Sequence, residues 1–285
     1  MEVEDRGRAK DFLQTHSYYR VIVYRFSFQD EKDRFRRGTR FDDLTALYLF
    51  DLALRRLLFS GLTIFELAFR EHFSFCIGRL YGALPFESAR FLHRLGRADF
   101  WQKKVTDQAK QSGEPFVRHF NKTHHQEIPP VYALFEILTF GQLSRLFADL
   151  HDVQLRKKVA QDFMLREPVF QSFLAHAVFL RNLCAHHSYL WGRKLEVTPK
   201  LPKKSDSFLD GSINRNKHGS LYNSVVLLLW VVKELAGGTC FARSIRAFFE
   251  ESAYPVSRAE QPNLTQLGFP SDWLELDIWK TDEAR

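Results

Sequence analysis

Apolar side chains recur along most of this chain at steps of three and four residues, the spacing that places them on one face of an α-helix. The longest such pattern predicts a helix over residues 41 to about 81. Asp42 or Asp43 can cap the start of this helix, and Gly61 could divide or bend it. Gly82 follows its end, so the pattern has a signal at both boundaries.

Further helical patterns fill the rest of the chain. One begins at Pro129-Pro130, where proline suits the first turn of a helix, and continues to about residue 150 with Gly141 as a possible break. Another begins at Pro168 and delivers Arg181 at its far end. Residues 8–28 predict a short helix that runs into an irregular aromatic segment. Further short helices are expected at about 87–95, 99–111, 116–123, 155–165, 221–235 and 241–249, with loops at 30–40 and 199–219.

The elements predict an all-α fold, because no run of alternating Val, Ile and Thr is long enough for a sheet. We expect an elaborated helical bundle forming a single domain over residues 1–285. Its parts would be an N-terminal aromatic segment to about residue 40, a helical body over about 41–250, and a tail over about 251–285. Trp273 and Trp279 lie in the tail, so we expect it to dock against the body.

Composition adds a basic charge to this picture. The formal net charge is +7, which favours an anionic partner such as RNA, although many proteins without such a partner are equally basic. The N-terminus has no signal-peptide core, and the longest apolar run, 225–232, is too short to cross a bilayer. The three cysteines form no CxxC pair. We therefore expect a cytoplasmic protein without a membrane partner.

The segment 180–191 (LRNLCAHHSYLW) concentrates more chemistry than any other. Arginine stays cationic and fits phosphate oxygens, and histidine exchanges protons near neutral pH. These two groups suffice for metal-free RNA cleavage. We expect His186 to act as general base or acid, Arg181 to hold the scissile phosphate, and Asn182 to orient the histidine or bind the sugar. His187 is a second candidate for the role of His186.

Two other interpretations of this segment stay open. The arginine, asparagine and histidines could form a buried polar network that ties helices together. A metal site is less favoured, because adjacent histidines point to different sides of a helix and no HExxH or CxxC accompanies them. His124 and His125 are also adjacent and are therefore equally poor candidates for a metal site; a surface loop is the favoured interpretation for them. The sequence therefore predicts no metal ion and no cofactor, and it contains no P-loop.

The spacing of Arg181 and His186 predicts a dimer. Residues five apart on an ideal helix point roughly 140° away from each other. The two side chains can share a site only if the backbone bends between them or if a second copy of the chain completes the site. A two-fold homodimer with residues 168–191 at its interface would place two arginines and two histidines in one cleft.

Arg181, Asn182 and His186 also match the R-x4-6-H signature of HEPN ribonucleases, in which a polar residue often follows the arginine. The wider segment 181–191 resembles the Abi family of bacterial abortive-infection proteins, in particular its AbiD/AbiF-like group. The segment before residue 16 is short, so an N-terminal helix of relatives is expected to be missing or reduced here. The resemblance extends over nearly the whole chain, through blocks at 16–20, 41–55, 66–70, 130–144 and 268–279.

This resemblance implies a HEPN-like all-α fold, dimeric assembly and anti-phage defence through a metal-independent endoribonuclease that leaves a 2′,3′-cyclic phosphate. It also implies a small non-coding RNA as a partner in some relatives. Two alternatives remain open at this point. The protein could bind RNA without cutting it, or it could be a toxin held inactive by such an RNA or by a protein antitoxin.

The remaining candidates each allow a structural and a functional interpretation. Glu66 with Arg70, and Asp51 with Arg55, have the i, i+4 spacing of a salt bridge within one helix, and the first pair could also contact the catalytic segment. Tyr189 and Trp191 could stack on a base or pack in the core. A basic run after the motif could follow an RNA backbone or be a solvated face; it comprises Arg193, Lys194, Lys200, Lys203, Lys204, Arg215 and Lys217.

Overall fold

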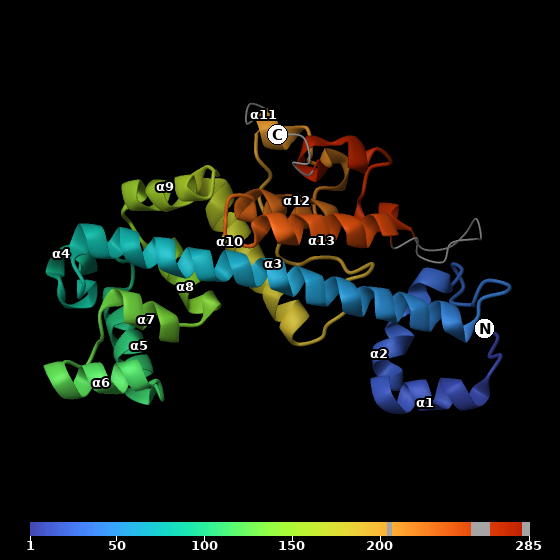
Figure 1. Ribbon diagram of the computed structural model, residues 1–285, viewed down its shortest axis with the longest axis horizontal. Helices are drawn as coiled ribbons and strands as arrows, with labels where there is room; N and C mark the ends of the chain where they lie inside the picture. Colours follow the sequence, from blue (N-terminus) through green and yellow to red (C-terminus); the bar gives the residue numbers. More distant parts are fainter. Residues whose placement is uncertain (204–206, 252–262, 281–285) are drawn as a thin grey trace.

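The computed structural model describes residues 1–203, 207–251 and 263–280. In these ranges the chain forms α-helices and 3-10 helices and no strand, with isolated β-bridges as the only extended pairing. The prediction of an all-α fold is therefore confirmed. Figure 1 shows one long helix running across the molecule, with the other helices gathered in groups along it.

The long helix is α3, Phe41–Tyr81, and it is continuous through Gly61. Its N-cap is Arg40, whose backbone N–H donates to the Asp43 carboxylate at 2.8 Å. Gly61 serves packing rather than bending, because a Cβ there would lie 2.5 Å from the ring of Phe241. The helix ends at Gly82, which has a φ of 86°.

The N-terminal unit packs against the first half of α3 (Figure 1). It consists of α1, Arg6–His16, then α2, Tyr18–Ile22, and a 3-10 helix, Val23–Phe28. Val21, Tyr24 and Phe28 are its main buried side chains. They recur at steps of three and four, so one face of this segment meets α3 and the other faces solvent.

A second group of helices surrounds the far half of α3 (Figure 1). The long helix predicted from Pro129-Pro130 is wrong in one respect, since it is two helices that meet at Thr139 and not at Gly141. Thr139 accepts from the backbone N–H of Gln142 at 3.2 Å, and Gln142 accepts from that of Thr139 at 2.7 Å. This reciprocal capping box starts the second helix and leaves Gly141 inside it. The group comprises α4, Ala89–Leu92; α5, Ala98–Gln111; α6, Pro115–His124; α7, Val131–Ile137; α8, Phe140–Asp149; and α9, Val153–Asp162.

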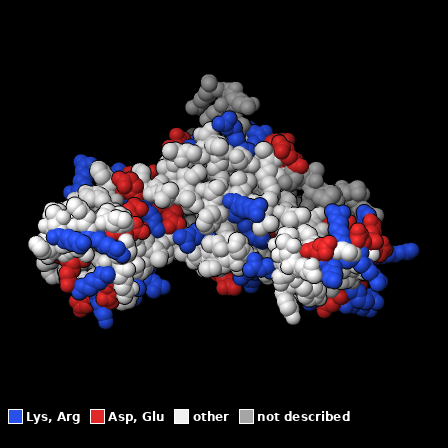
Figure 2. Space-filling view, turned by 60° about the horizontal axis from the view of Figure 1, so that its bottom comes forward, with Lys and Arg blue, Asp and Glu red and all other residues white. Residues whose placement is uncertain are grey.

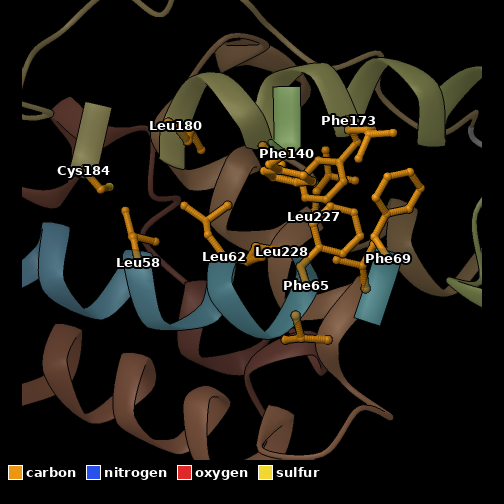
Figure 3. Close-up of a cluster of buried hydrophobic side chains, with 14 of the residues drawn as sticks. Leu58, Leu62, Phe65, Phe69, Phe140, Phe173, Leu180, Cys184, Leu227 and Leu228 are labelled. Carbon is orange, nitrogen blue, oxygen red and sulfur yellow. The ribbon is translucent and has the colours of Figure 1, made fainter. Parts of the chain in front are cut away.

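Three helices cover the middle of α3. They are α10, Glu167–Ala185, α12, Leu221–Val232, and α13, Gly238–Glu251. Pro168 lies in the first turn of α10, as predicted. Figure 3 shows the core at this crossing, where α10 contributes Phe173, Leu180 and Cys184 and α12 contributes Leu227 and Leu228. They pack against Leu58, Leu62, Phe65 and Phe69 of α3, with the rings of Phe65 and Phe173 centred 5.3 Å apart.

The described part of the tail, residues 263–280, lies against α12 and α13. Phe269, Trp273 and Trp279 are buried there, and the Trp279 indole N–H donates to the hydroxyl of Tyr222 on α12 at 3.4 Å. The tail forms 3-10 turns at Leu264–Leu267, Trp273–Glu275 and Asp277–Trp279. The segment expected as a loop at 199–219 contains a short helix, α11, Ser207–Asp210, and a 3-10 turn, Arg215–Lys217.

Candidate functional site

Helix α10 ends within the motif in a Schellman turn. The backbone N–H of His186 still donates to the carbonyl of Asn182 at 2.9 Å, as in a helix. His187 then adopts a φ of 58°, and Ser188 donates to the carbonyl of Leu183 at 2.9 Å. The helical rotation therefore persists as far as His186, and the chain changes direction at His187.

Arg181 is held by a carboxylate from α3. Its Nε donates to Oε2 of Glu66 at 3.2 Å, and its Nη1 donates to Oδ1 of Asn182 at 3.2 Å. The Glu66 side chain is buried, whereas that of Arg181 is 31% exposed. Nε and Nη1 are thus engaged, Nη2 has no hydrogen-bond partner among the described residues, and the side chain is partly exposed, so the guanidinium retains donors that can bind a phosphate.

The other oxygen of Glu66 binds Arg70, and Arg70 is in turn held by the break between α7 and α8. Nη2 of Arg70 donates to Glu66 Oε1 at 2.6 Å, and its Nη1 donates to the carbonyls of Phe135 and Leu138. The carbonyls in the last turn of a helix lack helical partners, so the break supplies these acceptors. Both interpretations of Glu66 and Arg70 therefore hold, since the pair is an internal salt bridge that also contacts the motif.

The second i, i+4 pair on α3 fixes the chain just after the motif. Asp51 is fully buried and accepts from the side chain of Arg55, from the Tyr24 hydroxyl at 2.5 Å, and from the backbone N–H groups of Leu190 and Trp191 at 3.2 and 2.9 Å. Burial raises the pKa of the Asp51 carboxyl, and the charge of Arg55 and the donated hydrogen bonds oppose that rise. The spacing predicted the Asp51–Arg55 pair, whereas the contact with the segment after the motif was missed.

His176 ties the following segment to α10. Its Nδ1 lies 2.6 Å from the carbonyl oxygen of Val197, and its Nε2 lies 2.8 Å from Oγ of Ser224 on α12. Burial lowers the pKa of His176 to about 4, so the ring is neutral at physiological pH. Sequence reasoning missed this residue, because a single histidine in an apolar helix gives no signal of its two partners.

The structure brings Arg181 and Asn182 together but leaves both histidines apart from them. His186 and His187 are exposed, and neither side chain forms a hydrogen bond or ion pair with any residue in the described ranges. Because α10 continues to His186, the divergence of about 140° between Arg181 and His186 applies within one chain. A single copy therefore does not assemble the predicted arginine–histidine site.

The basic run after the motif is dispersed. The guanidinium of Arg193 lies 5.1 Å from the centre of the Tyr189 ring, and Lys194 beside it is exposed. The backbone N–H of Lys200 donates to Oγ of Ser172, which lies 14 residues or about 20 Å before His186 on α10. Arg215 is paired with Asp210, Lys203 and Lys217 are exposed, and Lys204 lies outside the described residues.

Several other candidates have plain structural settings. Trp191 is buried and donates to Gln266, so it packs in the core, whereas Tyr189 is half-buried. His124 and His125 are exposed at the end of α6. Across residues 1–203, 207–251 and 263–280, no group of three or more His, Cys, Asp or Glu side chains is placed to hold a metal ion. No described helix is both long and apolar enough to cross a membrane.

Comparison with known proteins agrees with the resemblance noted in the sequence. A family model described as Abi-like protein matches residues 11–192, a range that runs from α1 to just beyond the motif and includes Glu66, Arg70 and Arg181. The C-terminal block at 268–279 lies outside this match. Neither the curated proteins nor the solved structures give a match. The chain therefore belongs to the family of Abi-like proteins, which associates it with abortive-infection defence.

Proposed function

We propose that this protein is a HEPN-like endoribonuclease of abortive-infection defence and that it cleaves RNA without a metal ion. The observation that carries the proposal is the fixed, partly exposed guanidinium of Arg181, which precedes two exposed histidines by five and six residues. A positioned cation and groups that exchange protons near neutral pH, brought together by a second copy of the chain, suit cleavage of a phosphodiester.

In the proposed reaction His186 takes the proton of a ribose 2′-hydroxyl. The 2′-oxygen then forms a bond to the adjacent phosphorus, the bond from phosphorus to the 5′-oxygen breaks, and the protonated histidine supplies a proton to that oxygen. The products are a 2′,3′-cyclic phosphate and a free 5′-hydroxyl. Arg181 stabilises the charge that develops on the phosphate oxygens. Asn182 orients Arg181 through its side-chain oxygen, and its amide nitrogen remains able to bind the sugar.

The proposed active unit is a homodimer. Arg181 and His186 diverge within one chain, so we assign each site to Arg181 of one copy and His186 of a second copy. Mixing Arg181→Ala with His186→Ala then gives mixed dimers in which one of the two sites is intact. We expect up to about a quarter of wild-type activity on mixing two inactive variants under subunit exchange. No recovery on mixing, with exchange verified by differently tagged copies, would refute the shared site.

Cleavage itself is tested with purified protein and total cellular RNA in EDTA. Wild type should cleave, whereas Arg181→Ala and His186→Ala should each lose at least about 100-fold in rate, as general acid–base catalysis and charge stabilisation imply. His125→Ala is a matched control, because it removes another exposed histidine, which lies at the end of a different helix. Cleavage that persists in both motif variants would refute the assignment. Bound RNA without cleavage by wild type would refute the nuclease and favour the RNA-binding alternative.

A further inference from the structure

Three large aromatic side chains of the N-terminal unit face solvent beside two arginines. Tyr18 is 52% exposed, Tyr19 83% and Phe26 63%. The Tyr18 and Tyr19 rings meet edge to face with centres 5.5 Å apart, and the Arg25 guanidinium lies 4.9 Å from the centre of the Phe26 ring. Arg20 is also exposed. We refer to these five residues as the aromatic–arginine surface, and such grouped exposed rings mark interaction sites more often than scattered ones do.

The backbone that presents the two tyrosines is strained. Ser17 joins α1 to α2 with a φ of 64° and a ψ of 131°, a conformation that L-residues rarely adopt. Its backbone N–H still donates to the carbonyl of Leu13 at 2.9 Å, so the last turn of α1 fixes it there. The strained residue sets the direction in which Tyr18 and Tyr19 leave α1. Their exposure is therefore built into the turn and does not result from a loose end of the chain.

The aromatic–arginine surface adjoins the segment that follows the motif. Tyr24, one residue before Arg25, places its ring 6.5 Å from that of Tyr189 and donates its hydroxyl to Asp51. The guanidinium of Arg193 lies 5.1 Å from the centre of the Tyr189 ring. Ring contacts thus link the N-terminal unit, through the buried ring of Tyr24, to Tyr189, which lies two residues after His187. In Figure 1 the end of α10 and the N-terminal helices lie on the same side of α3.

Arg25 of the aromatic–arginine surface and Arg193 beside Tyr189 both lack a compensating acid among the described residues. The Nε atoms of Arg25 and Arg193 are buried without a hydrogen-bond partner, and neither side chain forms an ion pair with a carboxylate of the described residues. Arg97, the N-cap residue of α5, makes a similar contact with the ring of Phe100 but is paired with Asp149. Figure 2 shows Lys and Arg in the central part of this face, with Asp and Glu mainly at its margins, whereas the lobe at the right, where the N-terminal unit lies, carries both signs. Unpaired arginines beside exposed rings fit a ligand that has both anionic groups and flat rings.

We infer that the aromatic–arginine surface binds single-stranded RNA and leads it to the motif. Bases stack on Tyr18, Tyr19 and Phe26, and phosphates bind Arg25 on this surface and Arg193 where the strand reaches the segment after the motif. A duplex does not fit this surface, because its bases are already stacked inside the helix and cannot cover exposed rings. This inference rests on the proposed function for the choice of RNA, and it adds the strand state of the substrate and the path by which it enters.

The test uses the full chain and a fluorescein-labelled RNA of about 12 nucleotides, a length within the range that one such platform covers. Every sugar carries a 2′-O-methyl group, so the RNA cannot be cleaved through its 2′-hydroxyl and binding is measured by anisotropy. Tyr18→Ala/Tyr19→Ala should weaken binding at least about 10-fold, since each stacked base contributes that much on alanine substitution. Tyr18→Phe/Tyr19→Phe keeps the rings and should bind as wild type does. Phe100→Ala is the matched control on the opposite lobe and should also leave the dissociation constant unchanged.

Four results would overturn the inference. They are an unchanged dissociation constant for the double alanine variant, an equal loss for Phe100→Ala, equal affinity of wild type for a duplex of the same sequence, and no binding by wild type. If Tyr18→Ala/Tyr19→Ala keeps its RNA affinity but no longer forms dimers in analytical ultracentrifugation, the surface contacts a second copy of the chain and not RNA. Because the RNA cannot be cut, binding that depends on the tyrosines stands even if no cleavage is found, and in that case only the proposed nuclease fails.

Discussion

Acidification should destabilise this protein through one buried histidine. His176 is 0% exposed, its Nδ1 and Nε2 contact Val197 and Ser224, and burial lowers its pKa to about 4. In the unfolded chain the same group has a pKa of about 6.5. Between these two values the unfolded state binds a proton that the folded state excludes. The free energy of unfolding is therefore fully retained above about pH 6.5 and falls as the pH drops toward 4.

The magnitude follows from the difference of about 2.5 pKa units, which corresponds to about 3 kcal/mol over the whole range. About 2 kcal/mol of this should be lost between pH 7 and pH 5, because the folded form begins to protonate only near pH 4. The assay is urea unfolding at pH 7, 6 and 5, followed by circular dichroism. Carboxylates also titrate at the lower end of this range, so the comparison is made between variants and not with an absolute slope.

His176→Asn keeps one hydrogen-bonding group and does not titrate. It should be less stable than wild type at pH 7, and its unfolding free energy should fall by about 2 kcal/mol less than that of wild type between pH 7 and pH 5. His218→Asn changes an exposed histidine and should leave the slope unchanged. A His176→Asn variant with the same pH dependence as wild type would refute a neutral, buried imidazole at this position.

Three further substitutions test the packing and the site. Asp51→Asn leaves the buried Arg55 without its counter-charge and should cost about 3 to 5 kcal/mol in urea unfolding, and an unchanged midpoint would contradict the buried pair. Gly61→Ala should gain about 1 kcal/mol in helix propensity but lose about 1 to 3 kcal/mol by crowding the Phe241 ring, so we expect net destabilisation that Phe241→Leu relieves. Glu66→Gln should lower the rate of RNA cleavage at least about 10-fold at saturating RNA, because the motif arginine loses its charged anchor; full activity would show that this anchor does not position it.

Local spacing predicted most of the helices, because an apolar stripe with a period of 3.6 residues can be recognised without knowing which element the helix packs against. The break before α8 shows where this reasoning stops. The sequence drew attention to Gly141, yet the signal for the break is the Thr139 and Gln142 pair of a capping box three residues apart. The apolar stripe continues through the break, so periodicity alone predicted one helix where the structure has two, α7 and α8. The break also has a tertiary cause, since its free carbonyls bind Arg70.

The sequence predicted which residues belong to the candidate site but not how they contact one another. An i, i+4 spacing identifies Glu66 with Arg70 as a local pair, but nothing local shows that Glu66 also binds an arginine 115 positions later. The prediction that the basic run follows one RNA backbone was not met either, because tertiary contacts that the local sequence does not show separate its members. His176 holds Val197 against α10, so the chain runs back along that helix and carries Lys200 away from the motif. Sequence distance from the motif is a poor guide to spatial distance wherever the chain turns back.

The two anchors on α3 also bear on whether the motif is a structural network or a reactive site. Glu66 binds Arg181, and Asp51, 15 residues or about 22 Å earlier on the same helix, binds the backbone of Leu190 and Trp191. The motif is therefore fixed at both ends by buried carboxylates. A structural network would be expected to use its histidines, since buried polar groups that lack partners are costly. Here both histidines are left in solvent between the two fixed ends, and neither side chain has a hydrogen-bond or ion-pair partner among the described residues. Such an arrangement holds their backbone in place and leaves their side chains accessible, which is what proton transfer to a bound substrate requires.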